Sequence, residues 1–383
     1  MSARADTENF RDLFLTDTPL LDVRAPVEFA RGAFPTSENI PLLDNDQRRA
    51  IGIRYKEQGQ EAAIALGWEL ATAAIRQQRQ TAWRDFCRRH PHGYLYCFRG
   101  GLRSRLSQQL LAETGVDYPL VRGGYKAMRR FLLQQLEHAC GNARLILLSG
   151  PTGSGKTAVI RALPRALDLE GRANHRGSAF GGLPGGQPAQ IDFENALSID
   201  WLRLHHRDPQ PVFVEDEGRL IGKLTLPPGL QSAMRQSPIA VLEHPLEERV
   251  QQIIDDYIMS LAPRDPTYGD DTAVARFQTG IQASLDRIKK RLGDQRHRFL
   301  SASFTAAAAH LRQTGSAEGY REGVALLLRE YYDPMYAYQL DKRRGDVVFR
   351  GDREEVIAWA QNAAESGGLP GCSHRNTAPL SPL

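Results

Sequence analysis

The chain has 383 residues, of which 41% are hydrophobic and 25% are charged, and it carries a net charge of +4 with a pI near 8.9. Its length exceeds that of one ordinary hydrophobic core and predicts two domains, while the globular composition excludes a fibrous or wholly disordered protein. No apolar run approaches the roughly 18 residues that a membrane span needs, and the N-terminus lacks the apolar core of a signal peptide, so we expect a cytoplasmic protein with no membrane partner.

Residues 1–140 alternate short apolar runs with amphipathic stretches. Strand character is found in four runs, at 19–24, 38–43, 93–98 and 118–124. Helical periodicity is found in three stretches, at 61–90, 102–114 and 125–138. Such alternation predicts an α/β domain with a largely parallel sheet.

A second α/β domain is predicted over 141–365, because a buried strand at 143–150 follows the break at Gly141 and Asn142. A helix is expected from Lys156 to about Ala166, and further buried strands are expected within 211–222 and 237–245. From Leu246 the pattern is mostly helical, which predicts a helical C-terminal extension. Residues 366–383 have the composition of a disordered tail.

One cysteine lies between an apolar strand and a helical stretch, in the sequence CFRGGLRS at 97–104. The N-terminus of a helix stabilises an anion through its unpaired N–H groups and its dipole, and Arg99 and Arg103 add positive charge. The same field stabilises a thiolate, the nucleophilic form of cysteine. We therefore predict a catalytic site at Cys97 with Arg99 and Arg103; the alternative is a small, inert, buried Cys97.

The other three cysteines are Cys87, Cys140 and Cys372. Cys87 and Cys140 lack a charged loop and are interpreted as buried apolar residues, while Cys372 lies in the predicted tail. The four cysteines form no CxxC pair and are too few for a disulfide framework, so we expect reduced thiols and no metal site made by the protein alone.

The first domain resembles the rhodanese family of sulfurtransferases in LLDVRAPVEFARGAFPTSENIPL at 20–42, in the cysteine loop, and in VRGGYKAM at 121–128. The resemblance implies that Cys97 carries a chalcogen as a persulfide. The single-domain rhodanese loop commonly has a cysteine, three further residues to a glycine, and then arginine, whereas five residues separate Cys97 from Arg103 here. A C-x5-R spacing is also typical of cysteine phosphatases, so chalcogen transfer, phosphoryl attack and a bulkier group on the sulfur all stay open.

The sequence LILLSGPTGSGKT at 145–157 fits the P-loop pattern G-x-x-x-x-G-K-T, with a buried strand before it and a helix after it. Backbone N–H groups of such a loop cradle a diphosphate, Lys156 reaches terminal oxygens, and Thr157 coordinates magnesium. The predicted phosphate-binding residues are Gly150, Thr152, Gly153, Ser154, Gly155, Lys156 and Thr157. The alternative is a glycine-rich turn that binds nothing.

Secondary candidates come from two further segments. The acidic triplet of Glu215, Asp216 and Glu217 follows a strand and predicts a Walker-B-like partner, with magnesium held by Thr157 and Asp216; the alternative is a solvated acidic loop. The glycine-rich segment 172–190 is too irregular for a helix or strand and predicts a functional loop or an exposed linker. As a functional loop it would bring to the anion Arg172, His175, Arg176 and Ser178.

The P-loop by itself leaves open hydrolysis, transfer to an acceptor hydroxyl, and stabilisation of a diphosphate leaving group. Basic and aromatic residues at 331–344, at 287–298, and around Arg129 and Arg130 favour RNA binding. Ordinary solvated surface or core packing explains each of these clusters as well.

The order of a rhodanese domain and a P-loop domain resembles the tRNA 2-selenouridine synthase family over residues from about 10 to 365. Four further segments carry the resemblance, namely GIRYKEQGQEAAIALGWEL, GRANHRGSAFG, FVEDEGRLIG and YYDPMYAYQL. It implies replacement of sulfur by selenium in wobble 2-thiouridine of tRNA, with selenophosphate as donor, through S-geranyl-2-thiouridine made from geranyl diphosphate. It also implies a selenophosphate-producing enzyme as partner and no tightly bound cofactor beyond magnesium.

Two alternatives to this function stay open. One is a P-loop kinase or ATPase with a regulatory rhodanese-like domain, and the other is a tRNA-binding carrier of sulfur or selenium. For the enzyme, the apolar helices of 246–330 are the predicted wall of a prenyl pocket, with core packing as the alternative explanation.

Overall fold

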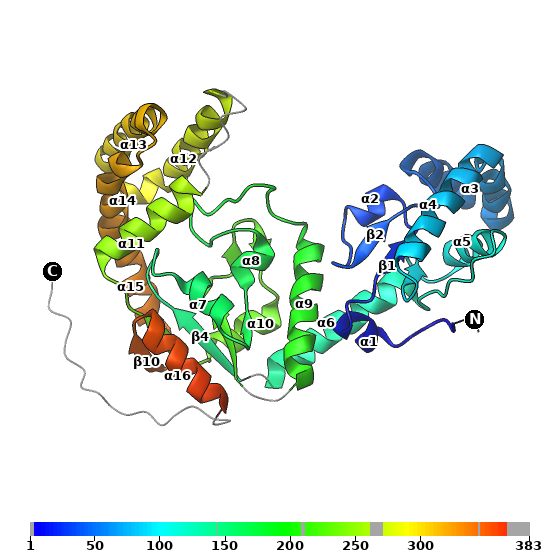
Figure 1. Ribbon diagram of the computed structural model, residues 1–383, viewed down its shortest axis with the longest axis horizontal. Coiled ribbons are helices and arrows are strands. Elements are labelled where there is room, and N and C mark those ends of the chain that lie inside the picture. The colour runs from blue at the N-terminus through cyan, green and yellow to red at the C-terminus, as the bar shows by residue number, and fades with distance from the viewer. Residues whose placement is uncertain (1–3, 143, 208–210, 261–270, 344, 366–383) are drawn as a thin grey trace. The chain divides into compact units, whose positions relative to one another are not determined.

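The computed structural model describes residues 4–142, 144–207, 211–260, 271–343 and 345–365 (Figure 1). These residues form two compact units. Unit 1 contains the described residues up to Ala139 together with Ala189–His206, and unit 2 contains Cys140–Pro188 and the described residues from Arg207 onward. The assignment of Ala189–His206 to unit 1 differs from the single predicted boundary near residue 141. The predicted tail, including Cys372, lies outside the described residues.

Unit 1 is built on a three-stranded parallel sheet in the order β2-β1-β3. Its strands are β1 (Leu20–Asp22), β2 (Ser37–Asn39) and β3 (Tyr94–Tyr96). Its helices are α1 (Phe10–Leu15), α2 (Pro26–Phe29), α3 (Asn45–Leu70), α4 (Ala73–Arg89), α5 (Leu102–Ala112), α6 (Gly124–Asn142) and α9 (Gln190–Arg207). The expected strand at 118–124 forms only the parallel bridges of Leu120 to Leu95 and of Val121 to Thr7.

The side chains of β1 and β3 alternate between two apolar clusters, as the period of a strand requires. Leu21 and Leu95 pack with Trp83 and Phe86 of α4. On the opposite face, Leu20 and Tyr96 pack in a second cluster, which includes Met128 and Leu132 of α6 and Ile199 and Leu202 of α9. Burial of each such side chain contributes about 1.5–3 kcal/mol, so α9 is an integral layer of unit 1.

The long helix α3 was predicted only in part. Its N-terminus is capped by Asp44, whose Oδ1 accepts the N–H of Gln47 at 2.8 Å. Gly59 interrupts the helix with φ +84° and ψ −173°, a conformation that glycine tolerates. The helix therefore consists of two segments joined at a kink. The kink interrupts the helical period of the sequence, so no helix was expected before residue 61.

Unit 2 contains a five-stranded parallel sheet in the order β10-β9-β4-β6-β5. The strands are β4 (Leu145–Ser149), β5 (Ala166–Leu167), β6 (Val212–Glu215), β9 (Ile239–Leu242) and β10 (Val347–Gly351). A hairpin is added by β7 (Leu220–Ile221) and β8 (Leu224–Thr225). The α/β class with parallel sheets is thus confirmed in both units. The edge strand β10 was not predicted, because it follows the helical extension and pairs with a strand about a hundred residues earlier.

Four helices contact strands of this sheet: α7 (Lys156–Ala162), α8 (Leu169–Ala173), α10 (Pro228–Arg235) and α16 (Arg353–Glu365). Helix α7 is shorter than the expected 156–166, because Pro164 cannot continue a helix and β5 begins at Ala166. All five residues of β4 are buried, and the P-loop follows directly at its carboxyl end. This edge of a parallel sheet is where α/β proteins usually bind ligands.

The helical extension of unit 2 contains α11 (Leu246–Ile253), η1 (Ile254–Met259), α12 (Asp271–Leu292), α13 (Asp294–Thr314), η2 (Glu318–Tyr320), α14 (Arg321–Leu327), η3 (Leu328–Tyr332) and α15 (Asp333–Asp341). Its buried apolar side chains form one cluster that includes Val250, Leu285, Leu300, Phe304 and Leu328. The apolar pattern of 246–330 is therefore explained by packing of the extension against itself. No helix in the described part of the chain is long and apolar enough to cross a membrane.

Candidate functional site

The cysteine loop begins at Cys97, which follows β3 and is only 3% exposed. Its carbonyl accepts the N–H of Tyr125 at 2.9 Å, and the next carbonyl accepts the N–H of Lys126 at 2.9 Å. Gly124 has φ +57°, and a Cβ added there would lie 2.3 Å from the carbonyl oxygen of Cys97. The loop is thus fastened by its backbone to the start of α6, and the glycine of the VRGG sequence is required by this close approach.

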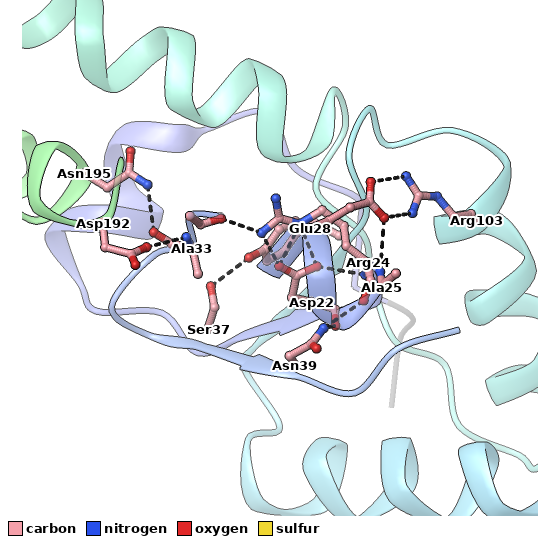
Figure 2. Close-up of polar contacts among 12 residues, drawn as sticks. Asp22, Arg24, Ala25, Glu28, Ala33, Ser37, Asn39, Arg103, Asp192 and Asn195 are labelled. Carbon is pink, nitrogen blue, oxygen red and sulfur yellow. Dashed lines mark hydrogen bonds and ion pairs between the residues drawn. The ribbon is translucent and has the colours of Figure 1, made fainter. Parts of the chain in front are cut away.

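The two arginines predicted at this loop have different surroundings. Arg103 makes a two-point ion pair with Glu28, with Nη1 2.6 Å from Oε2 and Nη2 3.2 Å from Oε1 (Figure 2). Burial acts to raise the pKa of Glu28, but the hydrogen bonds and charge of Arg103, with a contribution from Arg48, hold that pKa below its ordinary value. Arg99 is exposed and has no hydrogen bond or ion pair within the described residues. Arg99 is therefore the cation of this loop that an anion can reach.

A buried ion pair at the end of β1 was not singled out in the sequence. Arg24 is 2% exposed and pairs with Asp22 at 2.6 Å, and it also donates to the carbonyl of Gly32 at 2.9 Å (Figure 2). Its guanidinium lies 3.9 Å from the ring centroid of Tyr125. Burial acts to lower the pKa of Arg24, but the hydrogen bond and charge of Asp22 raise it, so the guanidinium stays charged. The only signal in the sequence was two opposite charges directly after an apolar strand.

The P-loop spans the residues between β4 and α7. Gly153 and Gly155 have φ of +83° and +85°, where other residues would be strained. Lys156 Nζ donates to the carbonyl of Gly150 at 2.8 Å, so the ammonium group lies over the loop. A cavity of about 1090 Å³ is lined by Gly150, Thr152, Gly153, Gly155, Lys156 and Thr157, while Ser154 is fully buried behind the loop.

Carboxyl groups from two elements meet at this cavity. Thr157 Oγ1 donates to Glu170 Oε2 at 2.9 Å. A Cβ added at Gly177 would lie 2.5 Å from Glu170 Oε1 and 2.7 Å from Glu217 Oε1, which shows how close the two carboxyl groups are. Burial and the neighbouring charge of Glu170 raise the pKa of Glu217 to about 8. Glu170 belongs to α8 and was missed, because no motif marks it.

The members of the acidic triplet have different surroundings. Glu215 is fully buried and accepts the N–H of Leu169 at 2.6 Å; burial first, and then the charge of Glu170, raise its pKa. Asp216 accepts the hydroxyl of Ser149 at 2.8 Å and forms an ion pair with Arg343. Glu170, not Asp216, is therefore the carboxylate that the structure places in contact with Thr157.

The pH dependence of anion binding follows from the Glu217 carboxyl group. Below its pKa of about 8 the group is neutral, whereas above it a second negative charge faces Lys156 and the bound anion. We expect the affinity for inorganic diphosphate to fall by about tenfold more in the wild type than in Glu217→Gln as the pH rises from 7 to 9. Isothermal titration calorimetry measures this affinity at each pH, with the exposed Glu243→Gln as the control variant. Parallel curves for wild type and Glu217→Gln would refute this role.

The glycine-rich segment contributes three of its four predicted residues to the same cavity, namely His175, Arg176 and Ser178. Arg176 donates to the carbonyl of Asp256 and lies 4.8 Å from the ring centroid of Tyr257. Ser178 Oγ lies 3.3 Å from the hydroxyl of Tyr257. Burial, with the charge of Arg287, lowers the pKa of His175. Arg172, on α8, is exposed and is not among the residues that line the cavity.

Two further arginines lie against the P-loop and were not predicted from the sequence. Arg249 is 5% exposed; its Nε donates to the carbonyl of Thr152 at 2.9 Å, and its guanidinium pairs with Asp333 at 2.5 Å. Arg353 lies so close to Gly155 that an added Cβ would be 2.4 Å from Nη2. Both come from distant helices, so no local pattern could have identified them.

The clusters predicted to bind RNA are only partly free. Tyr338 is 64% exposed and lies 5.3 Å from Lys342 Nζ, whereas Tyr332 is buried in the helical core. Arg129 pairs with Glu194 at 2.5 Å, and Arg130 is exposed. Tyr338 and Arg130 are thus available for stacking or phosphate contacts, and Tyr332 and Arg129 have structural roles.

The described cysteines, Cys87, Cys97 and Cys140, are not joined in disulfides. Burial raises the pKa of Cys87 to about 12, so that thiol stays protonated. Within the described ranges no three His, Cys, Asp or Glu side chains are grouped so that they could hold a metal ion.

Comparison with known proteins places this chain among one set of relatives. Residues 143–366 match the family described as tRNA 2-selenouridine synthase AAA domain. The chain is 47% identical over 363 residues to "tRNA 2-selenouridine synthase" of Marinobacter nauticus, covering 94% of this chain and 99% of that protein. It is 51% identical over 353 residues to the protein of the same description from Hahella chejuensis, covering 92% and 93%.

One solved structure is also similar, the N-terminal domain of a putative ATP/GTP binding protein from Clostridium difficile 630. It is 30% identical and covers 30% of this chain and 89% of that chain, with a TM-score of 0.29.

Proposed function

Because the chain belongs to the tRNA 2-selenouridine synthase family, we propose that it is a tRNA-modifying transferase that replaces sulfur by selenium in wobble 2-thiouridine. Geranyl diphosphate and selenophosphate are the proposed substrates, and S-geranyl-2-thiouridine is the intermediate. The observation that carries the proposal is that one chain holds both a cysteine loop with an accessible arginine and a P-loop cavity with a lysine. Unit 1 is the proposed rhodanese-like domain, since its parallel sheet presents Cys97 at a strand end.

The P-loop cavity serves the geranylation step. The thiocarbonyl sulfur of the nucleoside attacks C1 of geranyl diphosphate, a C–S bond forms, the C–O bond breaks, and diphosphate departs with the electron pair. The N3 proton of the nucleoside passes to water. The leaving group needs positive charge and N–H donors, which Lys156 and the backbone of 150–155 supply. The same cradle would accept the phosphate of selenophosphate, and binding measurements with each ligand separate the two uses.

Magnesium fits this cavity through oxygen ligands. It commonly uses one or two protein oxygens together with substrate phosphates. Thr157 and Glu170 are the residues that would hold it, since their side chains are in contact. The ion would supply positive charge to the departing diphosphate.

The cysteine loop serves the selenium-transfer step. Alkylation turns the sulfur at C2 of the nucleoside into a leaving group, so a selenium nucleophile can displace it. Cys97 takes part in this transfer, with Arg99 as the nearby unpaired cation. Arg103 positions the loop through Glu28.

Binding of tRNA is proposed to use exposed basic residues and the exposed ring of Tyr338. Contacts with phosphates release counterions, so their contribution falls as salt rises. We expect the affinity for tRNA to decrease by about tenfold or more between 50 and 200 mM salt, as measured by fluorescence anisotropy. An affinity that does not change over this range would argue against an electrostatic interface.

Reconstitution tests the proposed function against its alternatives. Pure protein, thiolated tRNA, geranyl diphosphate and selenophosphate are incubated together, and the nucleosides are identified by mass spectrometry. We expect 2-selenouridine without a second protein. A requirement for another enzyme would favour a tRNA-binding carrier, and ATP turnover stimulated by a small substrate, without a modified nucleoside, would favour a kinase or ATPase.

A further inference from the structure

A second cavity, of about 890 Å³, lies within unit 1 and has Cys97 in its wall. Most of its lining is apolar, and we call it the α3 pocket. Its principal apolar side chains come from both segments of α3 and from the start of α5: Ile51, Tyr55, Ile64, Trp68, Leu102 and Leu106. The volume is in the range of pockets that bind small molecules.

The kink in α3 creates this pocket. Gly59 lets the second segment of the helix turn back, so that a Cβ added at Gly67 would lie 3.6 Å from Cδ1 of Ile51. Ile51 and Gly67, sixteen residues apart in sequence, thereby line one cavity. A continuous straight helix would separate these positions by about 24 Å along its axis.

The apolar lining of the α3 pocket is open to solvent. Tyr55 is 55% exposed, Leu102 is 46% exposed and Trp68 is 40% exposed. Large apolar side chains that gather in one exposed place commonly mark a ligand or partner site. These three line the same cavity, which indicates that an apolar ligand covers them.

Polar side chains also line the α3 pocket. Cys97 and Arg99 are in its wall, and the ion pair of Arg103 with Glu28 forms part of the same wall. A ligand matched to both kinds of side chain has an aliphatic chain and a reacting group that meets the sulfur and the arginine. The apolar side chains of the helical extension, in contrast, are occupied in their own core.

We propose that the α3 pocket binds the geranyl chain of S-geranyl-2-thiouridine and so presents C2 of the nucleoside at Cys97. This inference rests on the proposed function and assigns the prenyl site to unit 1 instead of to the predicted wall at 246–330. A hydroselenide nucleophile, released from selenophosphate by water, forms the C2–Se bond. The C2–S bond breaks, geranylthiolate departs with the electron pair, and the proton of the hydroselenide passes to N3. Arg99 faces the departing thiolate.

The experiment compares two substrates in single-turnover selenation, tRNA with S-geranyl-2-thiouridine and tRNA with S-methyl-2-thiouridine. The wild type is expected to prefer the geranyl substrate by at least about tenfold, because only that chain fills the pocket. In Ile64→Trp, which fills the pocket, and in Trp68→Ala, which removes part of its wall, this preference should fall to about threefold or less. The rate with the methyl substrate should be retained, which shows that the variants are folded.

The control is Ala302→Trp, on the exposed face of α13 within the predicted wall at 246–330. It should keep the full preference for the geranyl substrate. An unchanged preference in both pocket variants, or an equal loss in Ala302→Trp, would overturn the pocket assignment while leaving the proposed function intact. A wild-type protein that converts neither substrate would overturn both.

Discussion

Replacement of Cys97 with serine is expected to lower the rate of 2-selenouridine formation by at least about 10³-fold while S-geranyl-2-thiouridine still forms and accumulates. Cys97 is the thiol in the wall of the α3 pocket where C2 meets the hydroselenide, and a serine hydroxyl does not reproduce the contact of that sulfur with the reacting carbon. The loop should keep its shape, because the contacts that fix it are made by the carbonyls of Cys97 and Phe98 to the N–H groups of Tyr125 and Lys126. Loss of product then reports on the sulfur itself.

The matched control for that substitution is Cys87→Ser. Cys87 is also a buried free thiol of unit 1, and its raised pKa keeps it protonated. We expect this variant to make 2-selenouridine at a rate within about twofold of the wild type. Normal product formation by Cys97→Ser would remove the role assigned to that residue.

Replacement of Lys156 with alanine is expected to weaken the binding of geranyl diphosphate or selenophosphate by about 10- to 100-fold. Its Nζ lies over the P-loop at 2.8 Å from the carbonyl of Gly150 and can turn to a phosphate oxygen. Removal of a charged donor at such a site costs about 1.5–3 kcal/mol. Equilibrium binding measured separately with the two ligands also identifies which of them the P-loop holds.

The exposed Lys223, on the turn between β7 and β8, supplies the matched control for Lys156. Lys223→Ala removes the same charge from unit 2 outside the residues that line the cavity. It should bind both ligands as the wild type does. If Lys156→Ala binds both ligands with undiminished affinity, the P-loop assignment is wrong.

Features carried by a short stretch of chain could be predicted from the sequence. The P-loop follows a buried strand and opens a helix, as expected, because its glycines and its flanking elements are contiguous. The cysteine loop follows β3 for the same reason. The sequence predicts that Asp216 holds magnesium together with Thr157. In the structure Asp216 forms an ion pair with Arg343, and Glu170 contacts Thr157, because residues distant in sequence pack together here.

Features that depend on distant contacts could not be predicted. The association of α9 with unit 1 involves two hydrogen bonds with Ala33, about 160 residues earlier: Asp192 Oδ1 accepts the N–H of Ala33, and Asn195 Nδ2 donates to its carbonyl (Figure 2). The α3 pocket requires the kink at Gly59. The direction in which the chain turns at a single glycine cannot be predicted from the sequence around it. The sequence could not decide whether the apolar helices of 246–330 line a prenyl pocket or form a core, because an apolar helix pattern looks the same in both cases.

The proposed function requires that one protein carries out both steps in a fixed order. Its most direct test is a time course of tRNA nucleosides by mass spectrometry, with excess protein, geranyl diphosphate and selenophosphate. We expect S-geranyl-2-thiouridine to rise first and then to decline as 2-selenouridine appears. Formation of 2-selenouridine when geranyl diphosphate is omitted, or a geranylated nucleoside that is never converted, would contradict it.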